Sequence, residues 1–262
     1  MTNQFGKLSR MCITAAQRNG KTVLADASFT APYKLMHPFQ RPDGGIQIMP
    51  VCASAGIMSG DSQEFIYQVQ DGAVLEVLSQ SFDKIHKMEE DGSANRHIQL
   101  TVGQDAVLYY APQPVIPFAQ SAFDSVMDIH LADESAKLFL QDILCCGRAV
   151  RGERFAYRRF TSKIMVYRGE QLIYRDNTKY LPEIMPMEEI GMYEGFTHMA
   201  NVLLFGLQND IREDVWELIE SSDCEGGITM LSPGDYVVRM FGTTAQKLKN
   251  VTEMLKKYVA IS

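Results

Sequence analysis

The sequence lacks the long apolar segments and the excess of basic residues that mark membrane and nucleic-acid-binding proteins. No stretch of its 262 residues approaches the roughly 18 consecutive apolar residues of a membrane-spanning helix. Lysine and arginine number 25 against 32 aspartate and glutamate residues, which gives a net charge of −7. An acidic balance of this kind argues against broad binding to a phosphate backbone or to an anionic membrane. We therefore expect neither nucleic acid nor a membrane as a partner.

Cysteine and histidine are scarce, and their spacing fits no common metal site or disulfide framework. The 5 cysteines form no CxxC pair, and the 5 histidines form no HxH or HxxxH pair. The N-terminal residues do not contain the unbroken apolar core of a secretory signal. We therefore predict a cytoplasmic protein with reduced thiols and without a tight structural metal site.

Signatures of catalysis are also missing. The segment GIMSGDS at residues 56–62 resembles a phosphate-binding loop only in its glycines, because the lysine that would contact the phosphates is absent. The same residues lack the GxSxG pattern of a nucleophile elbow. A glycine-permitted turn with an Asx-type side chain is the simpler interpretation.

What the sequence does contain is a long series of strand-like segments. Between about residues 64 and 175, runs rich in β-branched, aromatic and aliphatic residues alternate with turn residues. Three runs share a turn, an alanine and an alternating strand: DGAVLEV, QDAVLYY and ESAKLFL. Their alanines, Ala73, Ala106 and Ala136, lie 33 and 30 residues apart, which fits stacked β coils. Chance recurrence of a hairpin pattern explains the echo equally well at this point.

The C-terminal third changes to a helical pattern. Apolar residues recur at helical spacing in IREDVWELIESS (residues 211–222) and TTAQKLKNVTEMLKKYV (residues 243–259). Thr243 or Thr244 would cap the second helix, and Trp216, the single tryptophan, is expected in the core. No linker or charge run marks a domain boundary. We therefore predict one domain over residues 1–262, mainly β, with β-helix-like stacked sheets and two α-helices near the C-terminus.

A basic cluster interrupts the acidic chain. The segment GRAVRGER at residues 147–154 places three arginines around Glu153, and Arg158 and Arg159 follow closely. Guanidinium groups bind carboxylates well, so the cluster could bind carboxylates of a partner. An internal ion-pair network that neutralises Glu153 is equally consistent with the spacing.

Several short motifs occur in a defined order along the chain. They are APYKLM (31–36), GIMSGD (56–61), SQSFDKIH (79–86), PQPVIPF (112–118) and GRAVRGE (147–153), followed by DNT (176–178) and GFTH (195–198). Each string is weak alone, but their order and separations are specific and extend over nearly the whole chain. Together they resemble the UreD/UreH family of urease accessory proteins. The C-terminal helices match that family only in general character.

The resemblance implies a non-enzymatic scaffold for urease maturation. Such a protein would bind apo-urease and a UreF-type accessory protein, and through UreF it would join the nickel-carrying GTPase UreG. The fold of the family, β-helix-like stacked sheets with helices beside them, agrees with the repeat interpretation. An internal passage is the proposed nickel route of the family, so Ni²⁺ is expected in transit, with no permanently bound cofactor.

A passage for nickel needs weak ligands. Ni²⁺ stands high in the divalent affinity order, so clustered histidine or cysteine would retain it. Asp61, Glu153 and Ser79 offer oxygen atoms instead, and all three lie inside the matching motifs. By similarity to those motifs, we predict Asp61 and Glu153, followed by Ser79, as transient lining of the nickel route.

Two other functions compete with this hypothesis. A β-helical carbohydrate-active enzyme would use paired carboxylates such as Asp61 and Glu153 in a solvent groove. Such enzymes are commonly secreted and rich in groove-lining aromatics, whereas this chain shows no signal peptide and one tryptophan. A urease-independent metallochaperone would instead bind metal tightly as an isolated chain.

Overall fold

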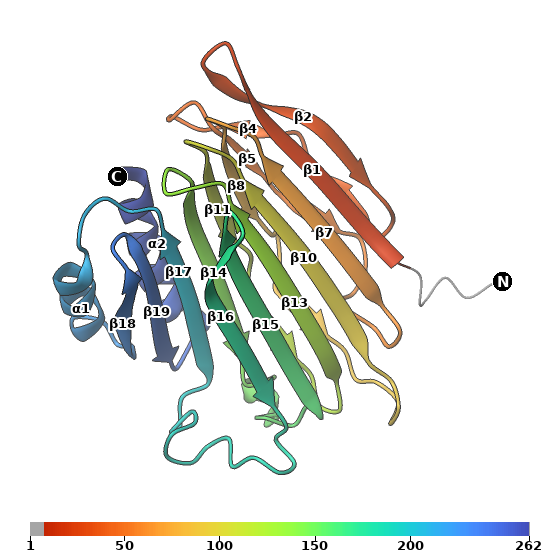
Figure 1. Ribbon diagram of the computed structural model, residues 1–262. Helices are drawn as coiled ribbons and strands as arrows, with labels where there is room; N and C mark the ends of the chain where they lie inside the picture. Colours follow the sequence, from red (N-terminus) through yellow and green to blue (C-terminus); the bar gives the residue numbers. More distant parts are fainter. Residues whose placement is uncertain (1–7, 262) are drawn as a thin grey trace.

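The computed structural model describes residues 8–261, apart from the side chain of residue 261, and contains two large sheets that pack face to face (Figure 1). The seven-stranded sheet has the order β16 (Gln171–Tyr180), β15 (Arg159–Arg168), β13 (Ala122–Leu131), β10 (Ala94–Val102), β7 (Ser62–Val69), β1 (Leu8–Arg18) and β2 (Lys21–Phe29). The main path of the ten-stranded sheet is β18 (Glu225–Ser232), β19 (Asp235–Gly242), β17 (His198–Phe205), β14 (Lys137–Cys145), β11 (Val107–Ala111), β8 (Val74–Leu78), β5 (Ile46–Ile48) and β4 (Phe39–Gln40). Its remaining strands are β12 (Val115–Pro117), which pairs with β14, and β9 (Asp83–Ile85), which pairs with β12; β3 (Tyr33–Leu35) and β6 (Pro50–Cys52) form a separate small sheet.

Successive coils of chain form the middle of the molecule. β7, β10 and β13 run parallel in one sheet, and β8, β11 and β14 run parallel in the other. The echoed alanines, Ala73, Ala106 and Ala136, are fully buried. The carbonyl oxygens of Ala73 and Ala106 accept hydrogen bonds of 2.9 Å from the N–H groups of Val107 and Lys137. The predicted β-helix-like stack is therefore confirmed, and the echo marks equivalent turns of neighbouring coils.

Strand alternation builds the core between the sheets. On β14, Leu138 and Leu140 face the opposite sheet, whereas Phe139 and Ile143 face the outer side. Inward residues of both sheets form the largest apolar cluster of the protein. Each fully buried valine, leucine or isoleucine contributes about 1.5–3 kcal/mol of transfer free energy. This cluster is therefore the main force that holds the two sheets together.

Two helices cover part of the outer face of the ten-stranded sheet (Figure 1). α2 (Ala245–Ile261) packs on β14, β17 and β19, and α1 (Arg212–Glu220) packs on β18. The buried stripe of α2 consists of Leu248, Val251, Leu255 and Val259. The N–H of Lys247 donates to Thr244 Oγ1 at 3.3 Å, so Thr244 provides the predicted cap. Within residues 8–261, no helix combines the length and the apolar character needed to cross a bilayer.

Trp216 on α1 departs from the sequence prediction. Val215 and Ile219 are the buried residues of this helix, whereas Trp216 is 48% exposed. Its Nε1–H donates to the Glu220 carboxylate at 2.7 Å. The prediction that Trp216 packs in the core is wrong because the ring lies at the margin of the apolar stripe, about 100° around the helix axis from Val215. At this margin the helix rests on an edge strand, which covers only part of the ring.

A further apolar cluster closes the lower end of the sandwich in Figure 1. It joins the first residues of several strands to the loop after β16 and to the segment around the short 3-10 helix η1 (Ala149–Arg151). Its aromatic members are Phe123, Phe155, Tyr157, Phe160 and Tyr193. The interior therefore has two apolar regions, and the polar residues described next lie between them.

Candidate functional site

A row of polar side chains interrupts the apolar inward face of the seven-stranded sheet. Gln63, Arg96, Ser125, Ser162 and Thr178 stand in direct register on β7, β10, β13, β15 and β16. Strand alternation points this row inward, because the residues two positions away on the central strands belong to the apolar clusters. Such a row inside a sandwich needs hydrogen-bond partners, since burying a polar group without one costs free energy.

The opposite sheet carries a matching row. Asp142, Asn201 and Arg239 pair with one another on β14, β17 and β19. Asp176 of β16 reaches this row, because it accepts hydrogen bonds from Asn201 Nδ2 at 3.3 Å and from Arg239. We name both rows together the polar layer; its members are Gln63, Arg96, Ser125, Ser162, Thr178, Asp142, Asn201, Arg239 and Asp176.

Arg96 occupies one end of the polar layer. Its Nε–H donates to Gln63 Oε1 at 2.8 Å, and its Nη2 lies 2.8 Å from Asp83 Oδ2. The guanidinium also lies over the rings of Phe65 and Phe123. Burial disfavours its charge, but Asp83 and neighbouring groups outweigh this effect and raise the pKa of Arg96. A permanent positive charge therefore sits at this end of the layer.

A cavity of about 70 Å³ opens beside Arg96. Three tyrosines line it, namely Tyr33, Tyr67 and Tyr110, and burial raises the pKa of each of their hydroxyls. The remaining lining includes Ser79 and Asp83. The cavity thus offers neutral hydroxyls and a carboxylate.

Two carboxyl groups occupy the middle of the polar layer. Burial raises the pKa of Asp142 to about 6, and the charge of Asp176 adds to the shift, whereas Arg96 and Ser162 oppose it. Asn201 lies next to them, and its Oδ1 is buried without a hydrogen-bond partner among the described residues. These groups surround a void of about 10 Å³, which is room for about one water molecule. The arrangement offers several oxygen ligands that would bind a cation weakly.

The far end of the polar layer reaches the surface at the edge of the ten-stranded sheet. Arg239 is paired with Asp176, and its Nη2 lies 3.5 Å from the hydroxyl of Tyr174. A groove of about 400 Å³ begins here, between β16 and the edge strand β18. The polar layer therefore runs from the cavity at Arg96, past the two central carboxyls, to a groove at the surface.

Comparison with known proteins finds relatives that match nearly the whole length of the chain. The family model described as "UreD urease accessory protein" matches residues 9–260. A protein named urease accessory protein UreD from Acetivibrio thermocellus is 35% identical over 98% of this chain and 98% of its own length. Urease accessory protein UreH from Helicobacter pylori strain P12 is 32% identical over 98% of this chain and 96% of its own. The chain belongs to the UreD urease accessory protein family.

Three residues of the UreD-like motifs, Asp61, Glu153 and Ser79, were predicted to line the nickel route. Of these, only Ser79 lines the cavity at Arg96. Its Oγ accepts a hydrogen bond of 2.7 Å from the N–H of Gln113 in the proline-rich motif. Ser79 therefore contributes a hydroxyl at the mouth of the polar layer.

Asp61 closes a turn in the glycine-containing UreD motif. Its Oδ2 accepts a 2.7 Å hydrogen bond from the N–H of Met58, and its own N–H donates to the Met58 carbonyl at 3.1 Å. The expected glycine-permitted turn is therefore present, with Gly60 at a φ of 83°, but the side chain bonds to a residue before it and not two residues after it as in an Asx turn. The side chain is partly exposed and does not line the cavity at Arg96. Its charge nevertheless acts on that cavity, because it adds a small part to the pKa shift that burial imposes on Tyr33.

Glu153 belongs to an ion pair in the last UreD motif before β15. Its carboxylate accepts from Arg148 Nε at 2.7 Å, pairs with Arg148 Nη2, and accepts from the N–H of Ala119 at 3.3 Å. The hydrogen bonds from Arg148 hold the pKa of Glu153 below its ordinary value. Arg148 also lies over the ring of Phe118, 4.0 Å from its centroid. Arg148 therefore forms the internal ion pair with Glu153 that was one of the two interpretations of the basic cluster. Glu153 does not line the cavity at Arg96.

The central residues of the polar layer were not selected from the sequence. The sequence did indicate that Asp142 faces inward. It lies two residues after Leu140 and four after Leu138 on the same strand, and alternate residues of a strand face the same side. A second signal was the UreD-like DNT motif, whose Asp176 and Thr178 both lie in the layer. Within residues 8–261, no three His, Cys, Asp or Glu side chains are grouped so that they could hold a metal ion.

Proposed function

We propose that this protein is a non-enzymatic scaffold for urease maturation that binds apo-urease and a UreF-type accessory protein, and joins a UreG-type GTPase through UreF. Nickel passes along the polar layer on its way to the urease active site. The relatives are named urease accessory proteins, which supports the general role. The observation that supports a route through the chain is the polar layer, since this row of polar residues extends from the cavity at Arg96 to the groove beside β18.

The chemistry of the polar layer suits transfer rather than storage. Its carboxylate, amide and hydroxyl oxygens are weak ligands for Ni²⁺ compared with imidazole or thiolate. A metallochaperone that retains nickel would need a cluster of strong ligands, and the described part of the chain contains none. The layer therefore fits an ion that enters, exchanges partners and leaves.

Transport along this route also requires motion. A hydrated Ni²⁺ ion is larger than the void of about 10 Å³ at the two central carboxyls. Side chains around Asp142 and Asp176 must therefore separate before the ion passes. Assembly with a partner is the event that we expect to open this part of the layer.

The alternative of a carbohydrate-active enzyme has little support in the geometry. Its proposed acid and base, Asp61 and Glu153, lie in separate loops. Asp61 is bound to a backbone N–H of its own turn, and Glu153 is bound to Arg148. Each carboxylate is thus engaged by a local contact.

Copurification tests the proposed function. The chain would be coexpressed with urease subunits and with UreF-type and UreG-type proteins, and the purified complex analysed for composition and for the nickel content of urease. We expect a complex that contains apo-urease and the UreF-type protein, and nickel-poor urease when this chain is omitted. A chain that associates with none of these proteins would exclude the scaffold role.

A further inference from the structure

The edge of the ten-stranded sheet presents an exposed strand. β18 ends the strand order of that sheet and pairs only with β19 within the described residues. An edge strand carries backbone N–H and C=O groups that can pair with another chain. The ladder to β19 also shifts register between Met230 and Ser232, so the strand is irregular only near its end. Most of β18 can therefore accept a further strand.

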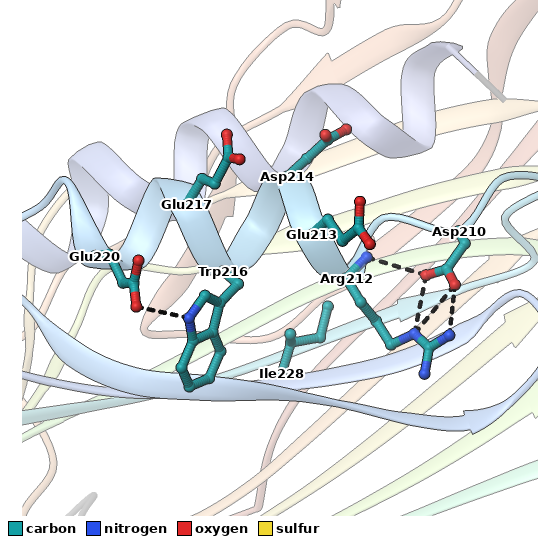
Figure 2. Close-up of a pocket in the computed structure, with 8 residues that line it drawn as sticks. All are labelled: Asp210, Arg212, Glu213, Asp214, Trp216, Glu217, Glu220 and Ile228. Atoms are coloured by element: carbon teal, nitrogen blue, oxygen red, sulfur yellow. Dashed lines mark hydrogen bonds and ion pairs between the residues drawn. The ribbon is translucent and has the colours of Figure 1, made fainter.

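One side of β18 is an acidic groove of about 930 Å³ beneath α1. Figure 2 shows Trp216 and Glu220 directed from the helix toward the strand, with Ile228 beside the indole ring. The lining contains Asp210, Arg212, Glu213, Asp214, Trp216, Glu217, Glu220 and Ile228. Arg212 is the one basic side chain among these eight residues, and Asp210 binds it at 2.6 Å. With five carboxylates and one guanidinium, the groove has a formal charge of −4.

The other side of β18 is less acidic. Strand alternation turns Thr229 and Leu231 away from α1, and these two residues line a second groove together with Tyr174 on β16. Leu231 remains 41% exposed there, whereas a Cβ atom added at Gly227 would lie 3.6 Å from Cζ3 of the Trp216 ring. A strand added at this edge would therefore place alternate side chains on two different surfaces.

We propose that the β18 edge binds an extended segment of a partner protein in which basic and aliphatic residues alternate. The backbone of the segment continues the sheet beyond β18. Its lysine or arginine side chains lie in the acidic groove, where the Trp216 ring supplies a cation–π surface and Glu213 and Glu220 supply charge. Its aliphatic side chains contact Leu231 and Tyr174. This inference does not depend on nickel transport.

Charge argues against a second copy of this chain as the occupant. Two β18 edges paired with each other would bring two grooves of formal charge −4 together. β18 itself contains one charged residue, Glu225, which is also acidic. A basic segment neutralises the groove, whereas self-association doubles its charge.

Trp216 provides a direct measurement, because it is the single tryptophan of the chain. The full-length protein would be titrated with a short peptide of alternating lysine and valine, and the tryptophan emission followed. We expect a saturable change that weakens as salt rises, because the groove charges are exposed. The same peptide with glutamate in place of lysine, or with a central proline that blocks strand pairing, should leave the emission unchanged.

Matched variants assign the binding to the groove. Glu213→Gln with Glu220→Gln keeps side-chain size and the acceptor for the Trp216 N–H, and should weaken binding by about three- to tenfold. The control pair, Glu183→Gln with Glu189→Gln, removes the same charge from exposed positions in the loop after β16 and should bind as the unmodified chain does. No response to the lysine peptide, equal affinity of both double variants, equal binding of the proline peptide, or dimerisation of the chain through this edge would each overturn the proposal.

Discussion

Asp142 and Asn201 lie opposite each other on β14 and β17, and the buried Oδ1 of Asn201 has no hydrogen-bond partner among the described residues. An unsatisfied buried oxygen costs about 1–3 kcal/mol. A water molecule or a cation at this position would satisfy the amide oxygen and bind the Asp142 carboxylate at the same time. Asp142 and Asn201 therefore favour the binding of a water molecule or a cation in the polar layer.

Replacing Asp142 by asparagine should change how stability depends on pH. The folded state raises the pKa of Asp142 from 3.8 to about 6, so this group favours folding at low pH and loses that contribution as pH rises through about 6. Asp142→Asn should therefore be more stable than the unmodified chain at pH 7, by roughly 3 kcal/mol, and lose this advantage below about pH 4. Urea denaturation across this pH range measures the difference. The exposed Asp26→Asn is the control, and an equal trend in both variants would contradict the assignment.

Removing the charges of both central carboxyls should impair nickel delivery. Asp142→Asn with Asp176→Asn keeps the side-chain volumes but takes the anionic ligands out of the polar layer. We expect copurification with apo-urease and the UreF-type protein to persist while the nickel content of urease falls severalfold. The double variant Asp105→Asn with Asp133→Asn, at turns between strands, is the control for the loss of two charges. Normal nickel content in the central double variant would exclude this route.

Asp61 and Glu153 allow a separate test of the motif-based prediction. Asp61→Asn retains an acceptor for the Met58 N–H, and Glu153→Gln retains an acceptor for Arg148. If these residues line the route, both substitutions should lower the nickel content of urease and leave the complex intact. If they are structural, the complex and activation should fail together. Analysis of copurified partners and of bound nickel in each variant distinguishes the two results.

The isolated chain should bind Ni²⁺ weakly. The described residues provide no cluster of three strong ligands, and scattered carboxylates form no closed coordination cage. Calorimetry on the purified protein should show no tight stoichiometric site. A site with a dissociation constant of about nanomolar strength that disappears with one His or Cys substitution would indicate a storage protein instead.

Enlarging a stacked alanine should destabilise the coils. Ala106 is fully buried where one coil contacts the next, and its carbonyl oxygen binds the backbone of the following coil. Ala106→Leu should lower the free energy of unfolding by about 1–3 kcal/mol, because a tightly packed interior resists added volume. The exposed Ala132→Leu is the matched control and should change stability by less than about 0.5 kcal/mol. The two midpoints of chemical denaturation decide between these expectations, and equal midpoints would mean that the coil contact tolerates the added volume.

The sequence contained enough information for both helices, whereas for the stack the repeat pattern was ambiguous until the resemblance to the UreD/UreH family was added. The recurring alanines and alternating strands are local patterns, and equivalent turns of the coils preserve them. The exposure of Trp216 could not be predicted from the sequence, because helical spacing does not reveal that α1 packs on an edge strand. The polar layer depends on register between strands far apart in the chain, as between Arg96 and Gln63. Alternation along one strand can indicate that a polar residue faces inward, but it cannot show which residue of another strand lies opposite to it.

Each parallel array of the stack ends in an antiparallel strand on both sides. In one sheet these strands are β2 and β16, and in the other they are β4 and β17. The reversal of chain direction stops the helical repeat, much as terminal caps stop other solenoids. Length variation in such a protein should therefore occur in whole coils of about 30 residues, added between the caps. A partial coil would shift the parity of every later strand and expose the core that the repeat buries.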